Sequence, residues 1–202
     1  MPDTTIALLI FLFPLAYSPG PGNMFFAAMG AKFGPRATIG ANAGYHVATF
    51  AMTAAIGLGF ASLVQNAPDL MTFMKWAGSA YVLWLASALW REGVLKDDGK
   101  ARPAGFGAGA MLLLLNPKAY VIIALMFTQF LPRGMGGADM NGVPQVIWIT
   151  TVFTLNNLIA FCVWILIGDQ IAARFREKTS AKRLNAGFAL ILAAVAVWMF
   201  VA

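Results

Sequence analysis

The sequence predicts an all-α membrane protein in which six transmembrane helices form two inverted three-helix repeats. Of its 202 residues, 60% are hydrophobic and only 11% are charged, whereas about a quarter of the residues of a soluble domain are charged. The chain divides into six apolar segments, and a helix needs about 20 such residues to cross a bilayer. Prolines interrupt the first and the fourth segment. Six spans leave no room for a soluble domain, so residues 1–202 are expected to form a single transmembrane domain.

The first predicted repeat, about residues 1–95, contains three spans. Residues 4–31 are uncharged, and Asp3 stands where a secretory signal would have a basic segment, so we expect a retained first span. The second span lies within residues 37–68, where His46 interrupts an otherwise uncharged run. The third covers about residues 70–90, with Lys75 near one end, from where its ammonium can reach the headgroups.

The second predicted repeat, about residues 100–202, contains the other three spans. They cover about residues 105–131, 140–168 and 184–202, and Lys118 lies near the middle of the first of these. An odd number of spans in each half places the two halves in opposite orientations. Inverted repeats with interrupted helices are a recurring transporter architecture.

The basic residues predict how the spans are oriented. Eleven of the 14 Lys and Arg residues lie in the loops after the first, third and fifth spans. Such loops stay on the cytoplasmic side, so both termini are expected on the outer, periplasmic side. The same loops account for the net charge of +6, whereas a nucleic-acid-binding protein carries basic residues on a folded aqueous face. We therefore expect the lipid bilayer, and no nucleic acid, as a partner.

Prolines break the first and fourth spans at corresponding places. A proline inside a helix removes an N–H and clashes with the carbonyl four residues earlier, at a cost of about 3 kcal/mol. The carbonyls of Leu15, Tyr17 and Leu113 would then need partners from protein, water or ligand. The breaks either kink the helices for packing or mark a substrate site, and we favour the site because they recur in both halves. Its predicted residues are Ser18, Pro19, Gly20, Pro21, Gly22 and Asn23 in the first break, and Asn116, Pro117 and Lys118 in the second.

The chemistry of the second break suits an anion. Asn116 and Pro117 are typical of a helix start, so the half-helix that follows presents free N–H groups and a positive dipole end. Lys118 adds a charge near the bilayer centre, at a cost of about 3 kcal/mol that is typical of functional residues. Asn23 is expected to begin a second such half-helix, so that both converge on the carboxylate of a zwitterionic substrate. Alternatively, Lys118 binds freed carbonyls, such as that of Leu113, and only stabilises the broken helix.

Polar groups elsewhere complete the predicted site. Backbone carbonyls freed in the first break, those of Leu15 and Tyr17, would hold the substrate's ammonium group. The second and fifth spans each carry polar residues on one helical face, namely Asn42, Tyr45, His46, Thr49 and Thr53 on the second, and Thr150, Thr154 and Asn157, with Asn156 nearby, on the fifth. Hydrogen bonding between helices is the alternative role. We prefer that role for the threonines, and both roles stay open for Asn42 and Asn157.

Two titratable residues are candidates for carrying a coupling proton. His46 lies inside its span and has an ordinary pKa of about 6.5, so it can exchange a proton near physiological pH. A neutral histidine bonded to a neighbouring helix is the alternative. Asp169 stands at the cytoplasmic end of the fifth span and is the other candidate, unless it belongs to the solvated loop.

The motifs together resemble one known family. Residues 18–23 (SPGPGN), 34–44, 75–81 (KWAGSAY) and 116–118 (NPK) occur in this order, and the chain resembles the lysine-exporter (LysE/RhtB) amino-acid efflux family along its whole length. Members of that family are bacterial inner-membrane exporters of amino acids and related small metabolites. The resemblance therefore implies efflux driven by an ion gradient. Our preferred coupling ion is the proton.

The predicted function is thus a secondary transporter that works by alternating access between the two repeats. Neutral amino acids are the preferred substrates, because a mid-membrane lysine without an acidic partner disfavours a cationic one. A metal-ion exporter of the same superfamily is the alternative, although Cys162 and His46 are the only residues of their types and provide few ligands. A non-transporting subunit of a membrane complex is a further alternative.

Other features of the sequence add little to this prediction. An enzyme is not expected, since motifs such as HExxH and GxSxG do not occur, and neither a cofactor nor a metal site is predicted. Gly40 and Gly44, like Gly105 and Gly109, form GxxxG pairs, which allow membrane helices to approach closely. We expect these pairs to pack spans within one subunit, with a homodimer contact as the alternative.

Overall fold

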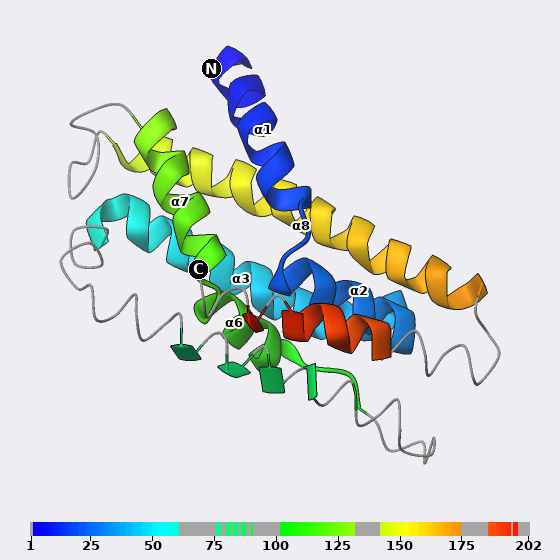
Figure 1. Cartoon of the computed structure of the whole chain (residues 1–202). Coiled ribbons are helices and arrows are strands. Elements are labelled where there is room, and N and C mark those ends of the chain that lie inside the picture. Colours follow the sequence, from blue (N-terminus) through cyan, green and yellow to red (C-terminus); the bar gives the residue numbers. More distant parts are fainter. Residues whose placement is uncertain are drawn as a thin grey trace.

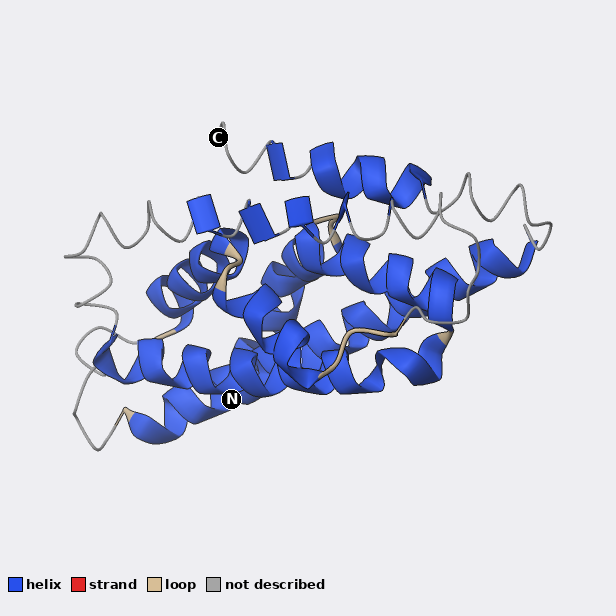
Figure 2. Ribbon diagram, turned by 90° about the horizontal axis from the view of Figure 1, so that it is seen from below, coloured by secondary structure: helices blue, strands red, loops and turns tan. Residues whose placement is uncertain are grey.

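The computed structural model describes residues 2–60, 102–131, 142–174, 186–194 and 196–197, and isolated positions between 76 and 90. Within these residues every regular element is a helix (Figure 2), which confirms the predicted all-α class. The third and sixth predicted spans are described only in part. Lys75 and most of the predicted cytoplasmic loop residues lie outside the described residues.

Five helical elements lie within residues 2–60 of the first half. They are α1 (Pro2–Tyr17), α2 (Pro21–Phe33), the 3₁₀ helix η1 (Pro35–Thr38), α3 (Ile39–Ala55) and the short π-helix η2 (Ile56–Phe60). Gly34 separates α2 from η1 with a φ of 78°, a conformation that glycine adopts without steric cost. Its N–H caps α2 by donating to the carbonyl of Gly30, at 2.9 Å. The chain can therefore turn sharply from the first predicted span into the second.

Three helices make up most of the described part of the second half. They are α6 (Phe106–Leu114), α7 (Pro117–Phe130) and α8 (Val143–Arg174). With 32 residues, α8 is long and apolar enough to cross a bilayer by itself. It runs the length of the bundle, with α2 alongside its second half (Figure 1).

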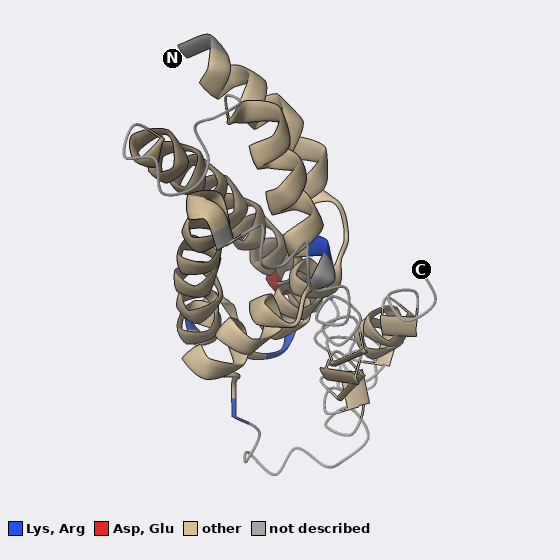
Figure 3. Cartoon of the chain, turned by 90° about the vertical axis from the view of Figure 1, so that its left-hand side faces the viewer, with Lys and Arg blue, Asp and Glu red and all other residues tan. Residues whose placement is uncertain are grey.

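The two predicted breaks are present, and they have the same bend. By length and composition, α1 with α2 and α6 with α7 each pass as one membrane span, and each pair is bent by 63° at its break. Most described basic residues lie near helix ends, and charges are sparse elsewhere on the described helices (Figure 3). These features are those of a membrane protein. The full six-span count and the inverted repeat stay predictions.

Two apolar clusters fill the described bundle. The first lies around α2, the second half of α8 and parts of α3 and α6, and it includes the fully buried Phe26 and Phe161. The second lies around α1, α7 and the first half of α8, and it includes the fully buried Leu12 and Met126. Because α8 contributes to both, it holds the two clusters together.

Glycines bring α2 and α8 into backbone contact. A Cβ added to Gly30 of α2 would overlap the carbonyl oxygen of Ile165 on α8. Conversely, a Cβ on Gly168 of α8 would overlap the carbonyl oxygen of Ala27 on α2. Membrane helices can come this close only where small residues face each other.

A second glycine-dependent contact joins α3 and α6. A Cβ on Gly44 would overlap the carbonyl oxygen of Phe106, and one on Gly109 would overlap that of Ala41. One glycine of each predicted GxxxG pair thus packs helices within the subunit, as expected. Gly105 has open space where a Cβ would be.

Candidate functional site

The two helix breaks lie against each other. The ammonium of Lys118, in the first turn of α7, donates to the hydroxyl and to the carbonyl oxygen of Ser18, at 2.9 and 3.3 Å. It also lies over Gly20, where a Cβ would be 3.1 Å from Nζ. The carbonyl of Leu113 instead accepts from the N–H of Asn116, at 2.9 Å. Lys118 therefore connects the second break to the first. The alternative, in which it binds a carbonyl of the break and only stabilises the helices, stays open, with Ser18 as the partner in place of Leu113.

The carbonyls freed in the first break have protein partners. Leu15 accepts from the hydroxyl of Ser18, and Tyr17 accepts from the indole N–H of Trp164 on α8, both at 3.2 Å. These two carbonyls were the predicted acceptors for a substrate ammonium group. Each of these carbonyls already accepts a hydrogen bond from a protein donor. An acceptor that has no donor is therefore better suited to binding the substrate's ammonium group.

Asn23 does not begin a half-helix, contrary to the prediction. The helix α2 starts earlier, with Gly20 as its N-cap and Pro21 in its first position, because proline has the right φ and needs no N–H partner there. The side-chain amide of Asn23 donates to the carbonyls of Ala16 and Ser18, at 2.8 and 3.1 Å. It fixes the end of α1 against the start of α2.

Replacing Asn23 by leucine, which has a similar size but no donor, is expected to lower the thermal unfolding midpoint of the purified protein. A buried polar group that loses its hydrogen bond costs about 1–3 kcal/mol, and two carbonyls are affected. Gln170→Leu, at an exposed position of α8, is the matched control. An Asn23→Leu protein as stable as this control would contradict the assigned role.

The helix α7 starts where the sequence predicts. Asn116 is its N-cap in extended conformation, and Pro117 is its first residue. The amide nitrogen of Asn116 donates to the hydroxyl of Tyr45 on α3, at 3.3 Å. Its Oδ1 is buried and has no hydrogen-bond partner among the described residues. This oxygen is an unused acceptor beside Lys118.

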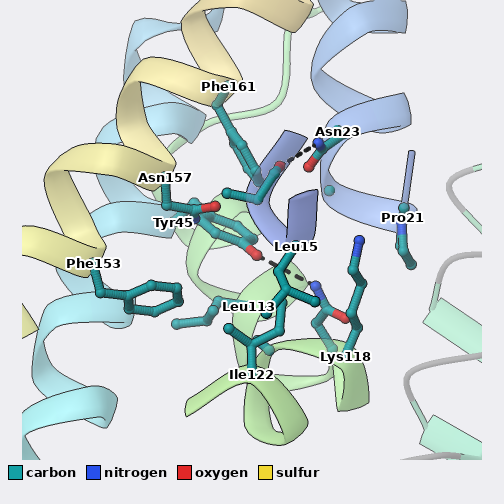
Figure 4. A pocket seen from close by; sticks show the side chains of 15 residues that line it. Leu15, Pro21, Asn23, Tyr45, Leu113, Lys118, Ile122, Phe153, Asn157 and Phe161 are labelled. Atoms are coloured by element: carbon teal, nitrogen blue, oxygen red, sulfur yellow. Dashed lines mark hydrogen bonds between the residues drawn. The ribbon is translucent and has the colours of Figure 1, made fainter. Parts of the chain in front are cut away.

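A small cavity lies where the starts of α2 and α7 converge (Figure 4). Its volume is about 20 Å³, which is room for about one water molecule. Its polar lining residues are Asn23, Tyr45, Asn116, Lys118 and Asn157. An amino acid is larger than this space, so its entry requires the walls to move apart.

Most predicted site residues meet at this cavity. It is lined by Gly20, Pro21, Gly22, Asn23, Asn116, Lys118 and Asn157. Ser18 joins the site through its bonds with Lys118. Pro19 is exposed and does not line the cavity, and of Pro117 only the backbone is described.

His46 and Asn42 lie behind the cavity wall. His46 donates through Nδ1 to the carbonyl of Asn42, at 2.9 Å. Its ring centroid is 5.3 Å from that of Tyr45 and 5.2 Å from that of Phe161, both of which line the cavity. The amide nitrogen of Asn42 is 3.9 Å from the sulfur of Cys162 on α8. His46 therefore contacts two of the aromatic rings that line the cavity.

The remaining predicted polar residues are not at the cavity. Asp169 is partly buried on α8, and the rise of a helix places it about 18 Å beyond Asn157. The hydroxyl of Thr49 donates to the carbonyl of Tyr45 in its own helix, at 2.8 Å, so the interhelical bond expected for it is wrong. The hydroxyl of Thr53 is buried without a partner among the described residues.

Phe153 and Phe161 line the cavity but were not predicted as site residues. They lie four residues to either side of Asn157, and this spacing places all three on one face of α8. The spacing is a sequence signal. It is weak, because most other positions of α8 are also apolar.

Comparison with known proteins identifies a family and several relatives that match most of the chain. A family model described as LysE type translocator matches residues 13–202. An uncharacterized membrane protein of Vibrio cholerae is 25% identical over 187 residues, which are 89% of this chain and 88% of that protein.

Two relatives have stated functions. The homoserine/homoserine lactone efflux protein of Salmonella typhimurium is 25% identical over 86% of this chain and 84% of its own length. The cysteine/O-acetylserine efflux protein of Escherichia coli K12 is 27% identical over 92% of this chain and 91% of its own length. No solved structure gives a significant match.

Proposed function

The chain belongs to the LysE type translocator family, and on this premise we propose that it exports small neutral amino acids or related metabolites across the bacterial inner membrane. Its relatives with stated functions are efflux proteins for such compounds, and the family is one of transporters, not enzymes. The observation that carries the proposal is the small cavity at which two helix starts and the ammonium of Lys118 converge.

The substrate's carboxylate binds at Lys118. The starts of α2 and α7 add N–H groups and the positive ends of two helix dipoles. Among the described residues, the ammonium of Lys118 has only neutral hydrogen-bond partners, the hydroxyl and carbonyl of Ser18. A carboxylate forms a stronger, charge-assisted bond than either of them. The substrate therefore replaces Ser18 as the partner of the lysine.

The substrate's ammonium group binds at Asn116. Its Oδ1 is a buried acceptor without a donor in the described part of the chain, and such a group costs free energy until it is paired. None of the described residues that line the cavity is acidic. A second positive charge on the substrate would have no partner there, which is the reason for preferring neutral amino acids.

Alternating access between the two repeats fits the uneven packing of the described helices. With both termini on the outer side, the contacts α2–α8 and α3–α6 lie on the cytoplasmic side, where backbones touch. The outer side is formed by α1, α7 and η2, which pack through side chains such as Phe127 against Gly57. Side-chain contacts rearrange more readily than interlocked backbones, so the outer half opens first from this closed state.

The coupling ion in this proposal is the proton, carried by His46. Replacing His46 by glutamine, whose amide can still donate to the Asn42 carbonyl, is expected to abolish accumulation driven by a pH gradient. Exchange of labelled for unlabelled substrate needs no driving force and is expected to continue. Gradient-driven transport with an unchanged pH dependence in this variant would exclude His46 as the carrier and leave Asp169 as the other candidate.

The proposed function is tested by counterflow in proteoliposomes. The purified protein is given unlabelled homoserine, serine, cysteine, lysine or glutamate inside and the labelled compound outside. We expect accumulation of the neutral amino acids and little of lysine. If the folded protein moves none of them, the proposal is wrong, and a partner-dependent role or another cargo, including metal ions, takes its place.

A further inference from the structure

The cavity has two chemically different walls. One wall carries the ammonium of Lys118 and the starts of α2 and α7, with Pro21 beside it (Figure 4). The facing wall belongs to α8 and is formed by Phe153, Asn157 and Phe161. A carboxylate bound at Lys118 points the rest of the substrate toward this second wall.

The part of the facing wall that α8 forms has one polar side chain between two aromatic rings. Asn157 is buried, with an exposed fraction of 7%. Its side chain also hydrogen-bonds Tyr45, and because an amide has two donors and an acceptor, it can pair one further group. Phe153 and Phe161 lie one turn before and one turn after it on the same face of α8, and both are buried. The wall can therefore pair a single hydroxyl, thiol or carbonyl, but a charge would be left without a partner.

Phe161 is held firmly in place at one end of this wall. Its ring lies over Gly22 of α2, where a Cβ would be only 2.7 Å from Cζ. It also packs against the rings of Tyr45 at 4.6 Å and Phe26 at 5.0 Å between centroids. A ring confined from three sides cannot turn aside for a long side chain.

We propose that Phe153, Asn157 and Phe161 form the selectivity wall for the substrate's side chain, an inference that rests on the proposed function. The wall admits amino acids with a short side chain that ends in one neutral hydrogen-bonding group. Asn157 recognises that group, and Phe161 sets the upper limit of side-chain length.

The test compares pairs of substrates on the same protein, so that the amount of active transporter cancels. Homoserine and norvaline differ only in a hydroxyl against a methyl group. Wild-type protein is expected to prefer homoserine in competition for counterflow of labelled serine. Asn157→Leu, which keeps the size but removes the hydrogen bond, is expected to lower this preference about tenfold, the effect of one buried hydrogen bond.

The length limit is tested with methionine against serine. Phe161→Ala is expected to raise the relative use of methionine about tenfold, because the removed ring leaves space for a longer side chain. Phe161→Leu serves as a second variant that keeps an apolar residue and is expected to give a smaller change in the same direction. Ile159→Ala, on the exposed side of α8 at 56% exposure, is the matched control and is expected to keep the wild-type ratios.

The outcomes separate the two proposals. If wild-type protein transports no amino acid, the proposed function is wrong and the selectivity wall falls with it. If wild-type protein transports amino acids but the variants at Asn157 and Phe161 keep its substrate ratios, the selectivity wall alone is wrong. Shifted ratios in these variants, with unshifted ratios in Ile159→Ala, support it.

Discussion

Replacing Lys118 by methionine is expected to lower amino-acid counterflow by about tenfold to a hundredfold while the protein stays folded. A hydrogen bond to a charged group contributes about 1.5–3 kcal/mol, and each 1.4 kcal/mol is about a factor of ten in affinity. The folded state loses little stability, because the carbonyl of Ser18 still accepts a hydrogen bond from Asn23. The hydroxyl of Ser18 still donates to the carbonyl of Leu15. Removing a charge from the bilayer also removes its insertion cost.

This prediction separates a substrate role for Lys118 from a purely structural one. A lysine that only ties the two breaks together would make Lys118→Met less stable in thermal unfolding, and transport would fall with the folded fraction. We expect an unfolding midpoint equal to or above that of wild type, with transport lost. Lys32→Met, near the end of α2 and outside the cavity lining, is the matched control and should transport normally.

Alanine in place of Gly168 or Gly30 is expected to have the largest effect on stability. The added methyl group would overlap a backbone carbonyl of the partner helix, and backbone cannot step aside as a flexible side chain can. Overpacking costs about 1–3 kcal/mol, so we expect a clear fall in the thermal unfolding midpoint of the detergent-solubilised protein. The added methyl group would also force α2 and α8 apart where their backbones touch, so transport should fall.

Gly107→Ala is the matched control for these variants. Gly107 lies within α6, and nothing lies within 4 Å of the position of its Cβ. Alanine favours a helix over glycine by about 1 kcal/mol, so this variant should be as stable as wild type or more so. Gly168→Ala and Gly30→Ala proteins that unfold at the same temperature as Gly107→Ala would show that α2 and α8 are not in backbone contact.

The breaks could be predicted because their causes are local. Proline suits the first turn of a helix, because its φ is already helical and it needs no N–H partner there, so Pro21 and Pro117 predict the starts of α2 and α7. The apolar composition likewise predicts a membrane protein. Asn23 misled the prediction because asparagine is a common N-cap, whereas here the neighbouring proline determines the helix start.

The partners across the site could not be predicted, because they are distant in sequence. Lys118 and Ser18 are separated by 100 residues, and the Trp164 bond to Tyr17 by 147. No local pattern selects one buried acceptor over another. Phe161 belongs to the site only because Gly22 leaves space for its ring, and this fit depends on how α2 packs on α8.

The most direct test of the account is whether Lys118 recognises the substrate's carboxylate. Binding of homoserine is compared with binding of 2-amino-1,4-butanediol, the same molecule with its carboxylate reduced, by competition against labelled homoserine on purified wild type and Lys118→Met. The account predicts that wild type prefers homoserine and that this preference drops by about tenfold or more in the variant. An equal preference for homoserine in both proteins would show that the carboxylate binds elsewhere and would contradict the account.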